Sequence, residues 1–232
     1  MTLDPDIFIK DNLKRTLERI DQSVLKSGRK REEVRLVAVT KRVEANRIKE
    51  AIKCGVEILG ENYIQEAKDK ISQIQAGVEW HFIGHLQSRK ARDAVELFDV
   101  IHSVDSLKLS KELNKRGKEK GKRVRILLQV NLSNEESKSG LKREAVLPLV
   151  EEVAELKSLI LEGFMMMPPF FADPEDVRPF FRNLSTLRNE ISDKTGLPLK
   201  ELSMGMSHDF EVAIEEGSTM IRVGTAIFGS RF

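Results

Sequence analysis

The sequence has 232 residues, 40% of them hydrophobic and 33% charged, which is ordinary for a soluble globular protein. Its 39 Lys and Arg against 37 Asp and Glu leave a formal net charge of +2, so no global field would recruit nucleic acid. The single cysteine, Cys54, cannot form an internal disulfide, and we expect it to serve packing in a reducing compartment. The start lacks a signal-peptide layout and no apolar run reaches membrane-spanning length, so we expect a cytoplasmic protein without a membrane partner.

The first predicted helix begins at Asp4 and Pro5, a favourable helix start, and ends at Gly28. Apolar, β-rich segments separated by helical periodicity then predict strands at residues 34–40, 56–59, 80–83, 100–104, 124–132, 159–166, 199–204 and 219–223. Eight strands with helical connections imply a closed parallel barrel. We therefore predict an α/β fold, a single (β/α)8 TIM barrel with an extra N-terminal helix, as one domain over residues 1–232.

Two details refine this prediction. The chain stops soon after the eighth strand, so the eighth outer helix must be short and the N-terminal helix is expected to cover the gap. The rival topology is an open doubly wound sheet, but no Gly-rich fingerprint follows the first strand.

The C-terminal stretch, residues 202–232, contains two strands that are each followed by small residues at a helix start. Gly217 is placed to end the helix between them, and Gly224 and Thr225 follow the eighth strand. Backbone N–H groups at such starts bind anions, and barrels carry a phosphate site after strands seven and eight. The pattern predicts a site for a phosphorylated ligand.

Lys41 ends a strongly apolar strand, on the face where barrel enzymes place their working groups. A partly desolvated lysine there favours a nucleophilic amine that can form a Schiff base, although a lysine that extends from a strand end into solvent is an equal alternative. Pyridoxal phosphate (PLP) would account for both features, because it has an aldehyde for the lysine and a phosphate for the turns. A Schiff base with a sugar-phosphate substrate is another possibility.

Arg222 interrupts an otherwise apolar eighth strand, so it needs a partner if it points inward. It could donate to the pyridine nitrogen of PLP, or form a structural ion pair with a carboxylate such as that of Glu201.

The histidines give weaker signals. His81 and His85 lack further metal ligands at suitable spacing, so no metal site is predicted, and His81 is expected to pack or hydrogen-bond under the ligand. His102 and His208 look isolated and are given no role. The polar segment 133–140 is interpreted as a surface loop that caps the barrel mouth, and Met165 to Met167 as mouth lining.

Several long motifs resemble the YggS-like (PROSC-type) pyridoxal phosphate homeostasis proteins. The resemblance runs from about Leu36 to Arg231 and is carried by LVAVTK, LGENYIQEAKDK, EWHFIGHLQSRKAR, HSVDSLKL, QVNLSNEESKSG, LSMGMSHDFEVAIEEGS and RVGTAIFGSR. It implies a barrel like the N-terminal domain of bacterial alanine racemase, with PLP held as an internal aldimine. The cofactor-binding positions that it implies are Lys41 (Schiff base), Asn62, Ser207, Arg222 (facing the pyridine nitrogen), Gly224 and Thr225 (with Ser207, the phosphate), with His81 and Ile83 near the ring.

Some positions depart from the family pattern. His85 stands where a proline is common, Arg89 where an asparagine is common, and the segment 166–168 varies the usual small residues. These positions are expected at the mouth of the barrel, so they affect its shape rather than the cofactor.

The resemblance implies a PLP-binding protein of intracellular PLP homeostasis with no or negligible catalysis, and no catalytic residue is assigned. PLP-dependent apoenzymes are possible recipients, and a monomer is expected. An arginine at the ring nitrogen discourages its protonation and weakens the electron sink, and no residues remain for a domain that supplies a second base. The alternative is a PLP-dependent amino-acid racemase.

Overall fold

The computed structural model describes residues 5–133, 135 and 139–229. Its strands are β1 (Arg35–Val39), β2 (Ile58–Glu61), β3 (Glu79–Phe82), β4 (Val100–Val104), β5 (Val124–Gln129), β6 (Leu159–Met165), β7 (Glu201–Met206) and β8 (Met220–Val223). Its helices are α1 (Pro5–Lys26), α2 (Ala45–Lys53), α3 (Ile64–Gln73), α4 (Ala91–Leu97), α5 (Leu107–Lys120), α6 (Arg143–Ala154), α7 (Arg178–Thr195), α8 (Phe210–Glu215) and α9 (Thr225–Phe228), with 3₁₀ turns η1 (Arg31–Glu33), η2 (Ser88–Lys90) and η3 (Pro174–Val177). The expected helix start at Asp4, the end of the family resemblance at Arg231 and most of the interior of the 133–140 loop lie outside the described residues.

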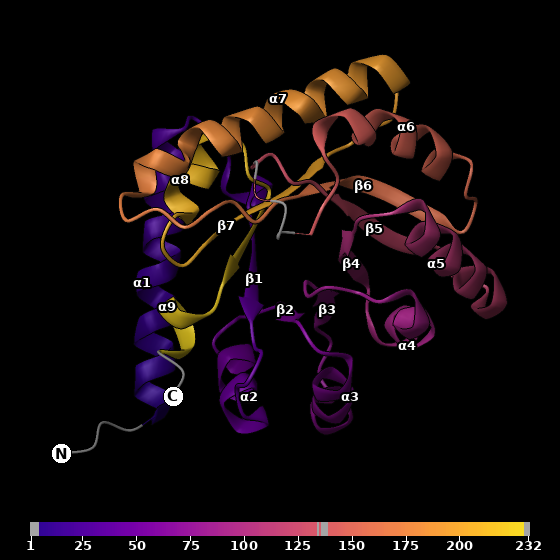
Figure 1. Ribbon diagram of the computed structural model, residues 1–232. Coiled ribbons are helices and arrows are strands. Elements are labelled where there is room, and N and C mark those ends of the chain that lie inside the picture. The colour runs from indigo at the N-terminus through magenta and orange to yellow at the C-terminus, as the bar shows by residue number, and fades with distance from the viewer. Residues whose placement is uncertain (1–4, 134, 136–138, 230–232) are drawn as a thin grey trace.

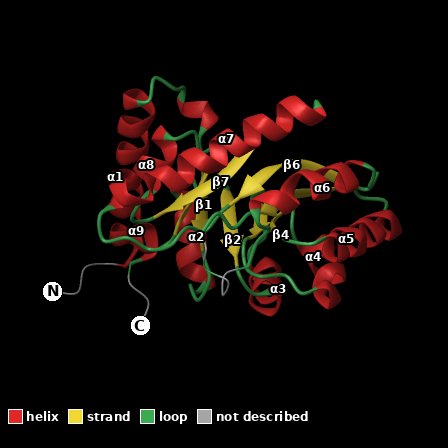
Figure 2. Ribbon diagram, turned by 45° about the horizontal axis from the view of Figure 1, so that its top comes forward, coloured by secondary structure: helices red, strands yellow, loops and turns green. Residues whose placement is uncertain are grey.

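The eight strands form a closed parallel barrel in the order β1 to β8, and β8 pairs with β1 to close it. Figure 2 shows the strands at the centre and the helices around them. The predicted fold class is therefore confirmed, and the open-sheet alternative is wrong. A parallel barrel suits this sequence because its strands are buried on both faces, which matches their near-continuous apolar runs.

Helix α1 packs against α2, α8 and α9, and so covers the side of the barrel where β8 meets β1. Figure 1 shows this long helix standing beside the two short C-terminal helices. The eighth outer helix, α9, has only four residues, so α1 supplies the apolar cover that a full-length helix would give elsewhere. Ile9, Leu13 and Ile20 are buried in this contact region. The expected role of the N-terminal helix is confirmed.

Several strand boundaries differ from the prediction. β2 and β7 begin two residues later than predicted, at Ile58 and Glu201, and β5 ends at Gln129. Val56 and Leu199 are buried, but they pack before the ladder begins, which apolar content alone does not distinguish from a strand.

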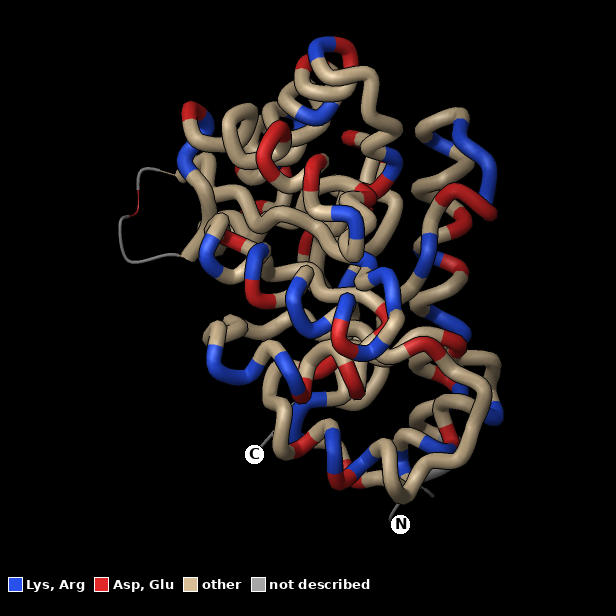
Figure 3. Tube along the Cα trace, turned by 90° about the vertical axis from the view of Figure 1, so that its right-hand side faces the viewer, with Lys and Arg blue, Asp and Glu red and all other residues tan. Residues whose placement is uncertain are grey.

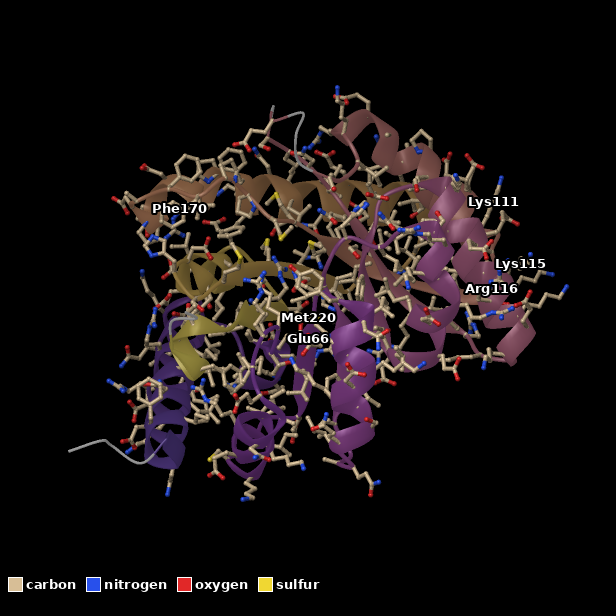
Figure 4. The ribbon with its side chains drawn as sticks, turned by 60° about the horizontal axis from the view of Figure 1, so that its bottom comes forward. Glu66, Lys111, Lys115, Arg116, Phe170 and Met220 are labelled. Carbon is tan, nitrogen blue, oxygen red and sulfur yellow. The ribbon has the colours of Figure 1, made fainter. Side chains whose placement is uncertain are left out.

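The barrel interior consists of layers of side chains. At the amino ends of the strands, the odd-numbered strands contribute a charged ring, which consists of Arg35, Glu79, Arg125 and Glu201. Ion pairs join Arg35 to Glu201 at 2.9 Å and Arg125 to Glu79 at 3.3 Å. Deeper inside lies a small apolar cluster of Val37, Ile58, Leu127, Met165 and Met220; Met220 is labelled near the centre of Figure 4. These layers fill the barrel below the carboxyl ends of its strands.

Lys and Arg (blue) and Asp and Glu (red) are interspersed along the trace in Figure 3. The basic residues of α5 lie at the surface: Arg116 forms ion pairs with Glu112 and Glu119 of its own helix, and Lys111 and Lys115 extend outward with it in Figure 4. Among the described residues, none of the helices combines the length and apolar character needed to span a bilayer.

Candidate cofactor site at the carboxyl ends of the strands

A cavity of about 260 Å³ opens at the carboxyl ends of β1, β2, β3, β7 and β8. Its lining residues are Val39, Lys41, Asn62, Ile83, Met167, Met206, Ser207, His208, Arg222, Gly224 and Thr225. All six positions that the sequence resemblance assigned to the cofactor lie in this set, together with Ile83. The structure thus brings together residues that are separated by up to 184 positions in the chain, from Lys41 to Thr225.

Lys41 follows β1 in a turn whose backbone is held on both sides. The ammonium of Lys70, on α3, donates to the carbonyl oxygen of Thr40 at 2.5 Å, and the amide of Arg42 donates to the carboxylate of Glu66. Arg42 has φ of 56°, which is unusual for a residue other than glycine. These contacts hold the backbone immediately before and after Lys41, so the position of the Lys41 Cα atom is fixed.

A buried ion cluster supports this turn, and sequence reasoning missed it. Lys70 Nζ lies 2.8 Å from Glu61 Oε1 and 2.6 Å from Glu66 Oε1, and Thr40 Oγ1 donates to Glu61 Oε1 at 2.7 Å. Glu61 is fully buried, and burial raises the pKa of its carboxyl group, although the bonds from Lys70 and Thr40 oppose the rise. A signal existed in the sequence, because Lys70 falls on the otherwise apolar face of α3.

Asn62 follows β2 and contributes a buried polar atom to the site. Its Oδ1 is buried and has no hydrogen-bond partner among the described residues. Its backbone is fixed by close packing, since a Cβ at Gly84 would lie 2.2 Å from the Asn62 carbonyl oxygen. An unpaired buried acceptor is costly, so a donor from a bound ligand would stabilise it.

The turns after β7 and β8 are joined through one hydroxyl. Ser207 Oγ accepts from the backbone N–H groups of Gly224 at 3.2 Å and Ala226 at 3.4 Å. Asp209 shapes the β7 turn, because its Oδ1 accepts from the Met206 amide at 2.6 Å, and burial raises the pKa of this carboxyl group. Together with Thr225, which is exposed toward the cavity, these groups gather backbone and hydroxyl donors at one end of the cavity.

Arg222 lies on β8 with only 4% of its surface exposed. Its Nη1 donates to Ser203 Oγ at 2.6 Å and its Nη2 to the Met166 carbonyl oxygen at 2.8 Å. Burial lowers the pKa of the guanidinium to about 10, and the nearby Asp209 opposes the shift. The alternative of an ion pair with Glu201 is wrong, because Glu201 pairs with Arg35 in the charged ring.

The interpretation of His102 and His208 as isolated is also wrong. His102 is fully buried, and its ring nitrogens lie 2.9 Å from Ser203 Oγ and 2.9 Å from His81 Nδ1. His208 lines the cavity, and its Nε2 lies 3.2 Å from the Phe171 carbonyl oxygen. Spacing along the sequence could not reveal the contact of His102, because its partner Ser203 lies 101 residues away.

His85 and Arg89, which were expected at the mouth of the barrel, are not among the residues that line the cavity. His85 is exposed, and its Nδ1 lies 3.8 Å from Asp105 Oδ2. Of the three methionines predicted to line the mouth, Met167 lines the cavity, whereas Met165 and Met166 are buried in the core, so that part of the prediction is wrong. Phe170, 80% exposed, lies beside His208 with ring centroids 5.2 Å apart. Figure 4 shows Phe170 at the edge of the molecule, remote from the basic residues of α5. In the described part of the chain, His, Cys, Asp and Glu form no cluster suited to a metal ion.

The fold and the cavity define the class: a (β/α)8-barrel protein whose ligand site lies at the carboxyl ends of its strands. The sequence model of the family "Alanine racemase, N-terminal domain" matches residues 10–232. The pyridoxal phosphate homeostasis protein of Aquifex aeolicus is 40% identical over 222 residues, which cover 95% of this chain and 97% of that protein. This chain belongs to the alanine racemase N-terminal domain family, among the pyridoxal phosphate homeostasis proteins.

Two solved structures extend the comparison. PipY of Synechococcus elongatus, solved with PLP bound, has a TM-score of 0.83 and 36% identity, covering 92% of this chain and 99% of PipY. Alanine racemase of Clostridium difficile has a TM-score of 0.74 at 17% identity and shares the fold; the match covers 95% of this chain and 57% of the racemase.

Proposed function

We propose that this protein binds PLP in the cavity described above and serves intracellular PLP homeostasis, as a carrier or reservoir rather than as an enzyme. The observation that supports the proposal most strongly is that Lys41 beyond β1, Arg222 on β8 and Thr225 at the start of α9 line one cavity. Asn62 and Ser207 line the same cavity. The names of the relatives and the PLP-bound state of PipY agree with it.

The residues fit the cofactor. PLP has an aldehyde, a phosphate, a phenolic oxygen and an aromatic nitrogen; when bound, it supplies an electrophilic carbonyl that condenses with an amine. Lys41 is the amine of the cavity, and Asn62 Oδ1 is a buried acceptor that lacks a partner among the described residues. A ligand hydroxyl beside Asn62 would satisfy that acceptor. The cavity volume of about 260 Å³ suits a ligand of this size.

Each residue has a proposed role. Lys41 forms the covalent linkage, and the turn that carries it is held by Lys70 and Glu66. Ser207, Gly224 and Thr225 bind the phosphate, because backbone N–H groups and hydroxyls that converge at a turn hold an anion. The side chain of Asn62 orients the ring from one edge. Arg222 would hold the ring nitrogen.

Arg222 supports the proposed non-enzymatic role. A guanidinium beside a ring nitrogen disfavours its protonation, and the unprotonated ring is a poor electron sink for carbanion chemistry. Arg222 remains charged at neutral pH, since even the lowered pKa is about 10. Two-base racemisation also needs an acid or base on the opposite face of the ring. The match to alanine racemase covers 57% of that enzyme, so the rest of the racemase has no counterpart in these residues.

The remaining features of the proposal concern context. We place the protein in the cytoplasm as a monomer with one PLP-binding domain over residues 1–232. PLP-dependent apoenzymes are its proposed recipients, and nucleic acid and membranes are not partners. The near balance of 39 basic and 37 acidic residues is in accord with the absence of a nucleic-acid partner.

Titration of the purified protein with PLP tests the proposal. The wild type is expected to gain a visible absorbance band at one PLP per chain, and Lys41→Ala to lose the band without losing helical circular dichroism. Lys10→Ala, which removes an exposed lysine of α1, serves as the control. No band in the wild type, or an unchanged band in Lys41→Ala, would refute the proposal. Robust turnover of an amino acid that disappears in Lys41→Ala would favour a racemase.

A further inference from the structure

A continuous line of hydrogen bonds runs through the barrel interior from the charged ring to the cavity. We call it the relay, and its members in order are Glu79, His81, His102, Ser203 and Arg222. Its four steps are Glu79 Oε2 to His81 Nε2 at 3.0 Å, His81 Nδ1 to His102 Nε2 at 2.9 Å, His102 Nδ1 to Ser203 Oγ at 2.9 Å, and Ser203 Oγ to Arg222 Nη1 at 2.6 Å. The members come from β3, β4, β7 and β8.

With both imidazoles neutral, the two ends of the relay determine the direction of every bond in it. A carboxylate only accepts hydrogen bonds, so His81 donates from Nε2 to Glu79, and its Nδ1 must accept. His102 therefore donates from Nε2, and its Nδ1 accepts from the Ser203 hydroxyl. The lone pairs of Ser203 then receive the N–H of Arg222, which can only donate. Two neutral histidines satisfy the whole line.

The surroundings favour this neutral arrangement. His81, His102 and Ser203 are fully buried, and burial lowers the pKa of both imidazoles, with the greater effect on His102. The charged groups that face the relay are Arg35 and Arg125 beside His81, Glu79 at its lower end, and Asp209 beside Arg222. A proton added to His102 would place a second buried cation next to Arg222, which is unfavourable.

We propose that His81 and His102 are positioning residues that act on Arg222 through Ser203. The relay holds the guanidinium as a donor in one orientation, fixed from below by Ser203 and at its side by the Met166 carbonyl. Arg222 also lines the cavity, and its remaining N–H groups are donors that an aromatic nitrogen bound there can accept. This inference rests on the proposed function, because it assigns to the relay the orientation of the residue that meets the PLP ring.

The tautomers of the histidines test the relay without PLP. Nitrogen-15 NMR of histidine-labelled wild-type protein at pH 7 is expected to show His81 and His102 as neutral rings with the proton on Nε2. Replacing each with Gln assigns the signals. A proton on Nδ1 of His102 would overturn the direction of the relay, and so would a charged ring at either position.

The PLP-loaded protein tests what the relay does. Ser203→Ala removes the acceptor of Arg222 and is expected to weaken PLP binding about tenfold, as for a lost hydrogen bond to a charged group. Ser203→Ala should also raise the pH midpoint of the visible band by about half a unit. The reason is that a guanidinium displaced by about 1 Å opposes the protonation of bound PLP less strongly. Ser103→Ala is the matched control: its hydroxyl is equally buried, lies on β4 beside His102 and has no partner in the described residues.

Two further variants separate positioning from packing. His102→Leu breaks the relay and should shift the band as Ser203→Ala does, whereas His102→Gln keeps a donor and an acceptor and should recover at least half of the shift. If wild type binds PLP but Ser203→Ala and His102→Leu match Ser103→Ala in affinity and midpoint, the relay has no positioning role. If wild type binds no PLP at all, the proposed function itself fails, whatever the tautomers are.

Discussion

The cluster behind Lys41 allows a quantitative prediction for Lys70→Met. The three N–H groups of the Lys70 ammonium reach Thr40, Glu61 and Glu66, so the substitution removes all three bonds that Lys70 donates. The fully buried Glu61 carboxylate then keeps the hydrogen bond from the Thr40 hydroxyl, but it has lost its positively charged partner. Breaking a buried pair in this way costs roughly 3–5 kcal/mol of unfolding free energy.

The pH dependence of this loss has a definite sign. Without Lys70, the buried Glu61 carboxyl group relieves its cost by binding a proton, so its folded pKa, already raised by burial, rises further. A carboxyl group with a raised folded pKa stabilises the fold below the unfolded pKa and loses that contribution as pH rises through the folded value. The destabilisation by Lys70→Met should therefore be smaller at pH 5 than at pH 8.

Urea unfolding of the cofactor-free protein measures the effect through the midpoint and slope. Adding Glu61→Gln to Lys70→Met removes the unpaired charge while keeping an acceptor for Thr40, and should restore more than half of the lost stability. Lys53→Met is the matched control. The Lys53 side chain is 75% exposed, and an ion pair at the surface such as the one it forms with Glu50 contributes about 0–1 kcal/mol. A loss below about 1 kcal/mol in Lys70→Met, or no recovery with Glu61→Gln, would refute the reasoning.

Two other predictions concern the phosphate turn and acid stability. Thr225→Val should weaken PLP binding by roughly 1–3 kcal/mol in equilibrium dialysis without changing the wavelength of the visible band, and unchanged affinity would place the phosphate elsewhere. Burial lowers the pKa of His81 and His102 in the folded chain, so below about pH 6.5 these imidazoles bind protons more readily in the unfolded chain. The free energy of unfolding should therefore fall as pH falls, by up to about 1.4 kcal/mol for each imidazole one pH unit below that value. His102→Gln should reduce this slope, and a stability that is flat between pH 7.5 and 5.5 would contradict the buried neutral histidines.

The barrel was predictable from the sequence because its signal is local. Apolar strand segments alternate with helical periodicity eight times, and the order of elements then leaves few topologies. The structure confirms the expected short α9 and the covering position of α1. The predicted strand boundaries were wrong where an apolar residue such as Val56 or Leu199 is buried just before its strand begins. Burial and strand pairing are separate properties, and apolar character indicates only burial.

The candidate site was predictable in part, and for a different reason. Lys41, Gly224 and Thr225 follow strand ends, which all meet at one rim of a parallel barrel, so their convergence needed only the fold. The assignment of Asn62 and Ser207 came from the family resemblance. The structure adds that both line the same cavity and that the Asn62 oxygen is buried.

The relay and the Lys70 cluster could not be predicted, because they depend on register. His102 contacts Ser203 only because the staggered pairing of the strands sets particular side chains at the same height inside the barrel. The sequence did carry a hint: His81, His102, Ser203 and Arg222 are polar residues inside apolar strands, and buried polar groups require partners. The same rule applies to Lys70 on the apolar face of α3.

The most direct measurement of the central claim is reduction of the PLP-loaded protein with borohydride, followed by proteolysis and mass spectrometry of the modified peptide. The account predicts one pyridoxyl group per chain, on Lys41. Reduction that labels another lysine, or that labels none while PLP stays bound, would contradict it.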